Sequence, residues 1–227
     1  MDALQVIATT RAIRRFTPEP VSDDDLAAIM FAASRAPSGS NRQPFRFVVL
    51  RESPRASEAR RILGGAFRAA WRTKRADDGY DAGSGTADSS PKARMARTMQ
   101  AFVEGFEDVP VVVLACFVPY RRVSIFDGGS VYPACQNLLL AARARGLGGV
   151  LSMWHVPVQD ELRRTLGLPD DVIVAATIAL GHPAGHHGPV RRRPLRELVY
   201  EDAWDAAAPW AVDPPGTRFT AAGPPPP

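Results

Sequence analysis

The positions of apolar residues along the chain predict several β-strands. Residues 109–117 read V-P-V-V-V-L-A-C-F, a continuous apolar run that predicts a strand near residues 110–117. A run of this kind is typical of a central strand buried on both faces. Shorter apolar runs predict further strands near residues 45–51, 148–154 and 172–180.

Apolar residues at three- and four-residue spacing predict helices between these strands. The clearest helix begins after Ser22, a capping residue followed by an acidic first turn, and ends before Pro37. Others are expected at residues 2–10, 53–74 and 159–166, from Pro91 onward, and between Gly129 and Gly146. A small sheet wrapped by helices places the chain in the α+β class.

The distribution of these elements predicts one domain with two less regular parts. Residues 1–207 contain no internal repeat and no clear linker. Within them, residues 55–105 form a variable helical excursion, interrupted at 76–90 by a loop rich in Gly, Ser and Asp. A loop of that length inside a compact domain is usually functional or disordered. Residues 208–227, rich in Pro, Ala and Gly, are expected to be a tail that buries too little apolar surface to fold alone.

The composition argues against several classes of protein. The net charge of +4 and the isoelectric point near 9.5 come almost wholly from arginine, since Lys74 and Lys92 are the only lysines. A charge this modest, with 8% aromatic residues and no zinc-finger or RNP-type spacing, argues against nucleic-acid binding. No segment reaches the about 18 apolar residues that a membrane span needs, and no charged-then-apolar leader opens the chain. We therefore expect a cytoplasmic protein without a membrane partner.

Cysteine and histidine usage gives no sign of a metal site or a nucleophile. Cys116 and Cys135 are too few for a disulfide framework and fit buried thiols in a reducing compartment. The histidines at 182–187 lack cysteine or acidic partners at a recognised metal spacing, so we expect no metal. The glycines at 146–149 follow a helix and enter a strand, which is the reverse of the dinucleotide-binding order.

Two motifs carry the candidate chemistry. The loop A-P-S-G-S-N-R-Q-P-F at 36–45 offers short, uncharged hydrogen-bonding groups that suit the edge of a planar heterocycle, although Gly, Ser and Asn also favour ordinary turns. The segment R-A-I-R-R-F at 11–16 supplies guanidinium groups, whose planar fork binds phosphate bidentately. Because arginine is common in this chain, a cluster such as Arg191–Arg193 is weaker evidence by itself.

Together these two motifs, at this spacing, resemble the amino-terminal signature of the nitroreductase family of FMN flavoproteins. The helix sequence Y-P-A-C-Q-N-L-L-L-A-A from 132, the G-L-G-G that follows and the A-L-G-H-P ending at 183 resemble the same family. The resemblance covers roughly residues 7–50 and 128–200. It implies a nitroreductase-like fold with a small, mostly antiparallel sheet, and an intertwined homodimer with its active sites at the subunit interface.

The resemblance also implies a set of FMN-binding residues. The phosphate is expected on Arg11 and Arg14 from the first motif and on Arg191 and Arg193 near the end of the domain. Asn41 and Gln43 are expected to read the pyrimidine edge of the flavin, and the backbone of Leu151–Met153 to pass its central ring with an N–H near N5. The full set of expected cofactor contacts is Arg11, Ala12, Arg14, Pro37, Ser38, Gly39, Asn41, Gln43, Leu151, Ser152, Met153, Arg191 and Arg193.

The function implied is that of an FMN-dependent oxidoreductase. NAD(P)H reduces FMN and leaves, and a planar acceptor such as a nitroaromatic or a quinone then takes the electrons, in a ping-pong mechanism. The catalytic chemistry takes place on the cofactor, so no side chain is assigned as catalytic. The same fold hosts other flavin chemistries, so a dehydrogenase or a reductive dehalogenase is an alternative, and a non-catalytic flavin-binding protein is a further one.

The aromatic residues of the 55–105 excursion have two interpretations. In the first, Phe67, Trp71, Phe102 and Phe106 simply pack two helices together. In the second, the excursion is a lid over the open flavin face, and an apolar slot for the acceptor is formed by Trp71, Tyr80, Ile125 and Phe126.

Overall fold

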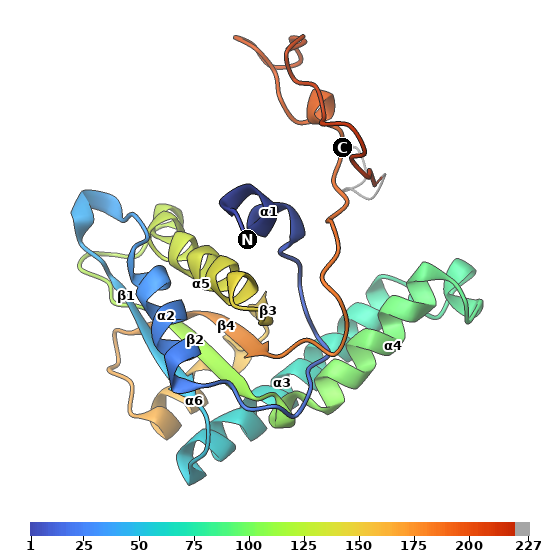
Figure 1. Ribbon diagram of the computed structural model, residues 1–227. Coiled ribbons are helices and arrows are strands. Elements are labelled where there is room, and N and C mark those ends of the chain that lie inside the picture. Colours follow the sequence, from blue (N-terminus) through green and yellow to red (C-terminus); the bar gives the residue numbers. More distant parts are fainter. Residues whose placement is uncertain (221–227) are drawn as a thin grey trace.

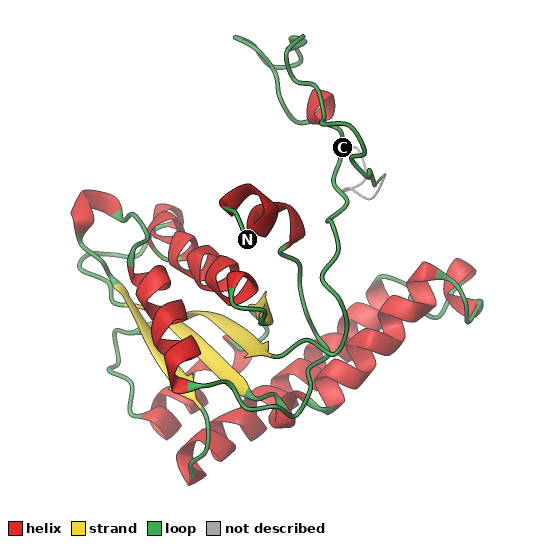
Figure 2. Ribbon diagram, in the orientation of Figure 1, coloured by secondary structure: helices red, strands yellow, loops and turns green. Residues whose placement is uncertain are grey.

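A four-stranded antiparallel sheet is the centre of the fold (Figure 2). The computed structural model describes residues 1–220. The strands are β1 (Phe45–Leu50), β2 (Val111–Phe117), β3 (Gly148–Ser152) and β4 (Ile173–Gly181), in the spatial order β1-β2-β4-β3. Each strand lies within a few residues of its predicted position, and the predicted α+β class is confirmed.

The central strand β2 is buried on both faces, as its uninterrupted apolar sequence predicts. It pairs with β1 from Val112↔Leu50 to Phe117↔Phe45, and with β4 on its other side. Because side chains alternate along a strand, Val112 and Leu114 belong to one hydrophobic core and Val113 to the other. A register shift in the β2–β4 pairing, between Ala115 and Cys116, marks an irregularity in this ladder.

Helices cover both faces of the sheet (Figure 1). On one face lie α2 (Asp23–Ser34) and α5 (Tyr132–Ala144), which pack against each other, with the short α1 (Ala3–Thr9) beside α5. On the other face lie α3 (Pro54–Asp77), α4 (Pro91–Glu104) and α6 (Gln159–Leu166). Single 3₁₀ turns occupy Gly39–Asn41, Gly83–Thr86, Phe106–Asp108, Ile125–Ser130, Val156–Val158 and Leu195–Glu197.

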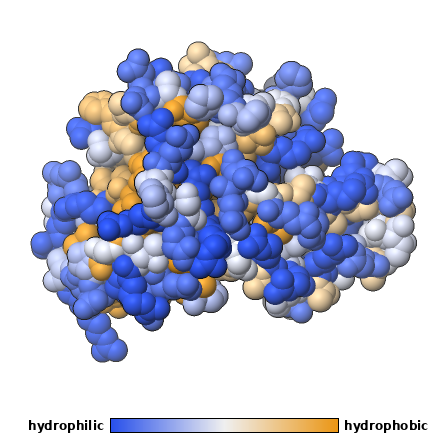
Figure 3. All heavy atoms as spheres, turned by 90° about the horizontal axis from the view of Figure 1, so that it is seen from below, coloured by the Kyte–Doolittle hydropathy of each residue, from blue (hydrophilic) through white to orange (hydrophobic). Residues whose placement is uncertain are grey.

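The helices α3 and α4 form a hairpin that extends past the edge of the sheet (Figure 1). Near the sheet an aromatic cluster holds it, since the ring centroid of Phe67 lies 4.2 Å from that of Phe106 and 6.1 Å from that of Phe102. The face of the molecule seen in Figure 3 is mostly hydrophilic, with scattered apolar areas. The α3 helix continues to Asp77, slightly past the predicted end at residue 74, because Lys74 bridges to Asp78 at its last turn.

The chain leaves the globular body after Val190, whose N–H donates to the carbonyl of Ala8 in α1. Residues 191–220 form an arm that runs away from the sheet (Figure 1). The arm folds back on itself through isolated bridges, Tyr200 with Ala207 and Arg192 with Phe219. Residues 221–227 of the predicted tail lie outside the described residues.

One buried arginine ties the hairpin to the sheet. Arg60 of α3 donates to the backbone carbonyls of Leu50 at 2.8 Å, of Glu107 and Pro110 at 3.1 Å each, and of Val109. These carbonyls lie where β1 ends and β2 begins. Burial lowers the pKa of Arg60, but its guanidinium remains charged because arginine does not titrate in the ordinary range.

We predict that Arg60→Leu lowers the free energy of unfolding by about 2–4 kcal/mol, because it leaves buried carbonyls without donors. Urea unfolding followed by circular dichroism measures this. Arg61→Leu is the matched control, since Arg61 is exposed and contacts only Glu58 on the same helix; its unfolding midpoint should barely move. Equal midpoints for the two variants would contradict the assigned role of Arg60.

Candidate active site

The arginine segment 11–16 is held beside the outer strand of the sheet. Ile13 N–H donates to the carbonyl of Gly149 at 3.0 Å, and residues 12 and 149 form a parallel bridge. Further along, Thr17 N–H donates to His182 O, and Ala184 N–H donates to Arg15 O, both at 2.9 Å. The segment therefore runs between β3 and the chain that follows β4, in a fixed backbone geometry.

Two glycines at the start of β3 make this close approach feasible. A Cβ on Gly148 would lie 2.5 Å from Ile13 Cγ1, and a Cβ on Gly149 would lie 2.6 Å from the carbonyl oxygen of Ala179. Real Cβ atoms do not approach other atoms so closely, so a larger residue at 148 would push Ile13 and the arginine segment away from the strand, and one at 149 would disturb the pairing with β4. The G-L-G-G sequence thus has a packing role.

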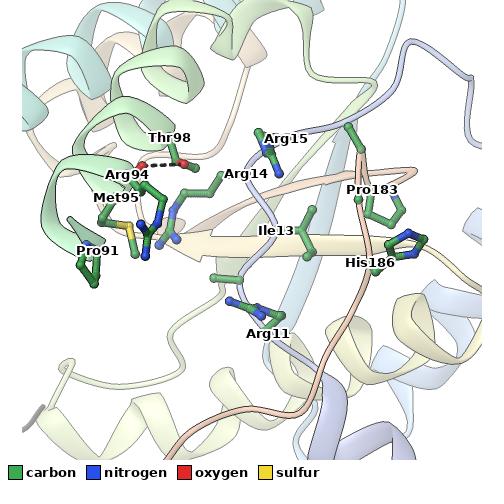
Figure 4. Close-up of a pocket in the computed structure, with 13 residues that line it drawn as sticks. Arg11, Ile13, Arg14, Arg15, Pro91, Arg94, Met95, Thr98, Pro183 and His186 are labelled. Atoms are coloured by element: carbon green, nitrogen blue, oxygen red, sulfur yellow. Dashed lines mark hydrogen bonds between the residues drawn. The ribbon is translucent and has the colours of Figure 1, made fainter. Parts of the chain in front are cut away.

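An arginine-lined cavity of about 350 Å³ opens against this segment. Its walls come from the 11–15 segment, from the first turns of α4 and from the chain after β4 (Figure 4). Figure 4 shows the side chains of Arg14 and Arg94 extending into the same region from two different elements. The charged and polar residues of the lining are Arg11, Arg14, Arg15, Arg94, Thr98 and His186.

The charge of this cavity is uncompensated. No Asp or Glu is among the lining residues, and within the described part of the chain no carboxylate pairs with Arg11, Arg14 or Arg15. Arg14 is partly buried, and this burial lowers its pKa. Arg11 and Arg15 are exposed, and the concentration of unpaired guanidinium groups around one cavity gives it the electrostatics of an anion-binding site.

A second, apolar cavity of about 460 Å³ adjoins the first. Arg14 and Met95 line both cavities, so the two cavities are neighbours at these residues. The apolar cavity is bounded on one side by residues 150–154 at the end of β3 and on the other by the hairpin, which contributes Lys74, Tyr80, Met95, Met99 and Phe102. The pair accommodates an elongated molecule with an anionic end and a flat apolar end.

Comparison with known proteins assigns the chain to a family. The sequence profile of the nitroreductase family matches residues 7–182. The chain belongs to the nitroreductase family. A protein named NADH dehydrogenase from Thermus thermophilus is 30% identical over 215 residues, covering 88% of this chain and 95% of the relative. The profile match includes the hairpin, which the resemblance seen in the sequence did not cover.

Solved structures show the same fold. A protein assigned as a nitroreductase, in complex with FMN, from Desulfovibrio desulfuricans is 30% identical, covers 90% of this chain and 98% of its own, and aligns with a TM-score of 0.63. An FMN- and NADPH-dependent nitroreductase from a Sphigopyxis species, 24% identical, covers 90% of this chain and 100% of its own, with a TM-score of 0.66. The nitroreductase fold expected from the sequence is confirmed.

Several residues expected from the nitroreductase resemblance meet at the joined cavities. Arg11, Ala12 and Arg14 line the arginine cavity, and Leu151–Met153 line the apolar one. Shortly after this segment comes His155, which is fully buried and whose Nε2 lies 2.7 Å from the carbonyl oxygen of Val174. Burial lowers the pKa of His155, so the ring stays neutral near pH 7.

The amide loop lies elsewhere in the same chain. Pro37, Ser38, Gly39, Asn41 and Gln43 line neither cavity. Gly39 N–H donates to Ser130 Oγ at 3.1 Å, Gln43 N–H donates to Ser38 Oγ at 2.9 Å, and the Gln43 side chain donates to Asn41 Oδ1 at 3.1 Å. Asn41 and Gln43 have φ values of 51° and 49°, a left-handed backbone that is strained for residues other than glycine. Such strain, held on an exposed loop, is common at binding sites.

The two remaining arginines of the predicted set stand apart from the cavities. Arg191 and Arg193 are exposed at the base of the arm and are not among the lining residues. Arg193 Nε instead donates to Glu197 Oε2 at 3.1 Å.

The residues expected to form the acceptor slot divide into three groups. Tyr80 lines the apolar cavity. Trp71 is only 1% exposed and donates from its indole N–H to Gln100 Oε1, so it is a packing residue behind Tyr80 rather than a wall residue. Ile125 and Phe126 are 90% and 79% exposed on the turn before α5 and line neither cavity.

Sequence reasoning missed the residues that α4 contributes. Pro91, Arg94, Met95 and Thr98 recur at helical spacing and place one face of α4 on the arginine cavity. The periodicity was visible in the sequence, but Arg94 is one arginine among many and the hairpin's position beside β3 is a tertiary feature. Arg15 was missed for the first reason, and Lys74, which also lies on the hairpin, for the second.

The described residues give no indication of other chemistry. No group of three His, Cys, Asp or Glu side chains among them is placed to hold a metal ion. Both cysteines are unpaired and buried, and burial raises the pKa of each thiol to about 11, which makes them poor nucleophiles. Within residues 1–220, no helix combines the length and the apolar character needed to cross a bilayer.

Proposed function

We propose that this protein is an FMN-dependent oxidoreductase that passes electrons from NAD(P)H to a nitroaromatic or quinone-like acceptor. The observation that carries the proposal is the junction of an arginine cavity with an apolar cavity at Arg14 and Met95. FMN has a phosphate at one end and a flat ring system at the other, which matches these two spaces.

The residues present fit the phosphate of FMN. A phosphate dianion needs several charge-assisted hydrogen bonds, and guanidinium groups supply them bidentately. Arg11, Arg14 and Arg15 come from one fixed segment and have no carboxylate partner among the described residues. Binding the phosphate would relieve the mutual repulsion of these charges, which is the physical reason for such a cluster.

The residues of the apolar cavity fit the ring system. The edge of β3 at Leu151–Met153 presents backbone that can hydrogen-bond a heterocycle, and the hairpin opposite supplies apolar walls. When bound, the cofactor supplies the reversible two-electron chemistry. The protein orients it and limits access to its face. Reductant and acceptor approach that face from the same cavity, which is why we infer that they bind in turn.

The relatives support this assignment. The Thermus relative is named for NADH oxidation, the Desulfovibrio structure contains FMN, and the Sphigopyxis structure is described as FMN- and NADPH-dependent. Because Cys116 and Cys135 are both unpaired, we place the protein in a reducing compartment such as the cytoplasm.

We further propose that the active form is a homodimer with its sites at the interface. Large apolar side chains are exposed on the arm and on the turn before α5, including Trp204 at 83% and Phe126 at 79%. Exposed apolar surface on this scale marks an interaction site. A second copy would cover it and could bring the amide loop, with Asn41 and Gln43, to the flavin edge of the first.

The hairpin has the position of a lid. Tyr80 and Met95 form part of the wall of the apolar cavity, whereas Phe67 and Phe106 pack in the core at the base. The aromatic residues at the base of the hairpin are structural. We propose that the end of the hairpin is a lid that governs which acceptors enter.

We predict that Arg11→Ala weakens binding of FMN by tenfold or more and leaves riboflavin binding unchanged, because only FMN carries the phosphate. A hydrogen bond to a charged group is worth about 1.5–3 kcal/mol, or about 10- to 150-fold in the dissociation constant. Calorimetric titration of apoprotein with each flavin measures both constants. Arg193→Ala, measured in the same way, tests whether the arm's arginine reaches the phosphate in the assembled protein.

The control for this comparison is Arg72→Ala, which removes an exposed arginine of α3 that lines neither cavity. It should bind both flavins like the original protein. If Arg11→Ala weakens FMN and riboflavin equally, Arg11 does not bind the phosphate, and if the original protein binds no FMN the whole proposal fails.

A second prediction concerns the lid. Replacing residues 76–89 by a short Gly/Ser linker should leave FMN bound but change kcat/KM for bulky acceptors by about tenfold, equivalent to about 1.4 kcal/mol of transition-state stabilisation. NADPH oxidation, measured with nitroaromatics and quinones of increasing size, gives these values. The same replacement at residues 169–171, an exposed turn before β4, is the control. Unchanged kinetics across all acceptor sizes would rule out the lid.

A further inference from the structure

Tyr80 occupies an unusual position at the end of the hairpin. It is half-buried and lines the apolar cavity opposite residues 150–154. Its ring is fixed on two sides, because its centroid lies 5.1 Å from that of Trp71 and the Lys92 ammonium lies 5.8 Å from the ring centre. An aromatic ring held in this way has few alternative orientations.

The hydroxyl group of Tyr80 is without a partner in residues 1–220. No described residue forms a hydrogen bond with it, although Tyr and Trp polar groups usually find a partner when their rings are buried. Tyr80 belongs to the cavity wall, and a donor on the wall of such a space is a common device for orienting a ligand.

Two basic residues share the wall of the apolar cavity with Tyr80. Arg14 and Lys74 line the same cavity. The hydrogen bond that Lys74 donates to Asp78 is the main factor that raises the pKa of Lys74, and Tyr80 adds a smaller electrostatic contribution there and at Arg14. Because no acidic residue lines the cavity, a ligand with electron-rich oxygen atoms is favoured at this end.

We propose that the Tyr80 hydroxyl donates a hydrogen bond to an oxygen of the acceptor, and so selects acceptors with a nitro or quinone oxygen over apolar molecules of the same shape. This inference rests on the proposed function and deepens it. Trp71 and Lys92 hold the donor in place, and Met95, Met99 and Phe102 contact the apolar body of the ligand. Tyr80 is thus a specificity-determining residue, and the electrons still come from the bound cofactor.

The test compares two ligands of similar shape, nitrobenzene and isopropylbenzene, of which only the first has oxygen acceptors. Binding of each to the oxidised, FMN-loaded protein is measured by calorimetry, so that no turnover is involved. Tyr80→Phe keeps the ring and removes the hydroxyl. We expect it to weaken nitrobenzene binding about fivefold, the value of one neutral hydrogen bond, and to leave isopropylbenzene binding within about twofold.

Tyr200→Phe is the matched control, because Tyr200 lies on the arm and stacks with Trp204; it should bind both ligands like the original protein. Tyr80→Phe should also lower kcat/KM for nitrobenzene by a similar factor without slowing reduction of the flavin by NAD(P)H. Unchanged nitrobenzene binding, or an equal loss for both ligands, would overturn the role of Tyr80. Failure of the original protein to oxidise NAD(P)H would instead refute the proposed function, while the binding comparison would still test Tyr80.

Discussion

The close packing of the arginine segment against β3 is the constraint on which the candidate site depends. Ile13 sits where a side chain on Gly148 would be, and its N–H is tied to Gly149 O. This contact fixes the backbone from which Arg11, Arg14 and Arg15 project. Since arginine side chains are long and flexible, the fixed backbone is what turns three separate charges into one site, and it places them next to the end of β3, where the ring of a cofactor would lie.

The second requirement is that the base of the α3–α4 hairpin stay packed against the sheet. Arg60 links α3 to the carbonyls at the end of β1 and the start of β2, and the aromatic cluster around Phe67 fills the space behind it. Both devices act at the base of the hairpin. The end, where Tyr80 lines the apolar cavity, is held by contacts within the hairpin, such as the ion pair of Arg75 with Asp81 and the packing of Tyr80 on Trp71.

The strands, most helix positions and the α+β class could be predicted from the sequence because each rests on a local pattern. The apolar run of β2 and the cap at Ser22 are examples. The first arginine motif and Leu151–Met153, which line the two cavities, were singled out because their sequence resembles a known family, and their binding of FMN stays a prediction. A local sequence pattern does not show which other part of the molecule a given surface will contact. The sequence did not distinguish Arg94 from other arginines, because its role depends on the position of α4 beside the arginine cavity. It left two interpretations of Trp71 open, and the burial of Trp71 behind Tyr80 favours packing. Asn41 and Gln43 lie on a loop that lines neither cavity.

The most direct test is a crystal structure of the protein grown with FMN. The account predicts a dimer with one FMN in each pair of joined cavities, its phosphate among Arg11, Arg14 and Arg15, its ring against the backbone of Leu151–Met153, and the amide loop of the second copy at the ring edge. FMN bound elsewhere on the protein, or cavities that stay free of FMN at saturating concentration, would contradict it.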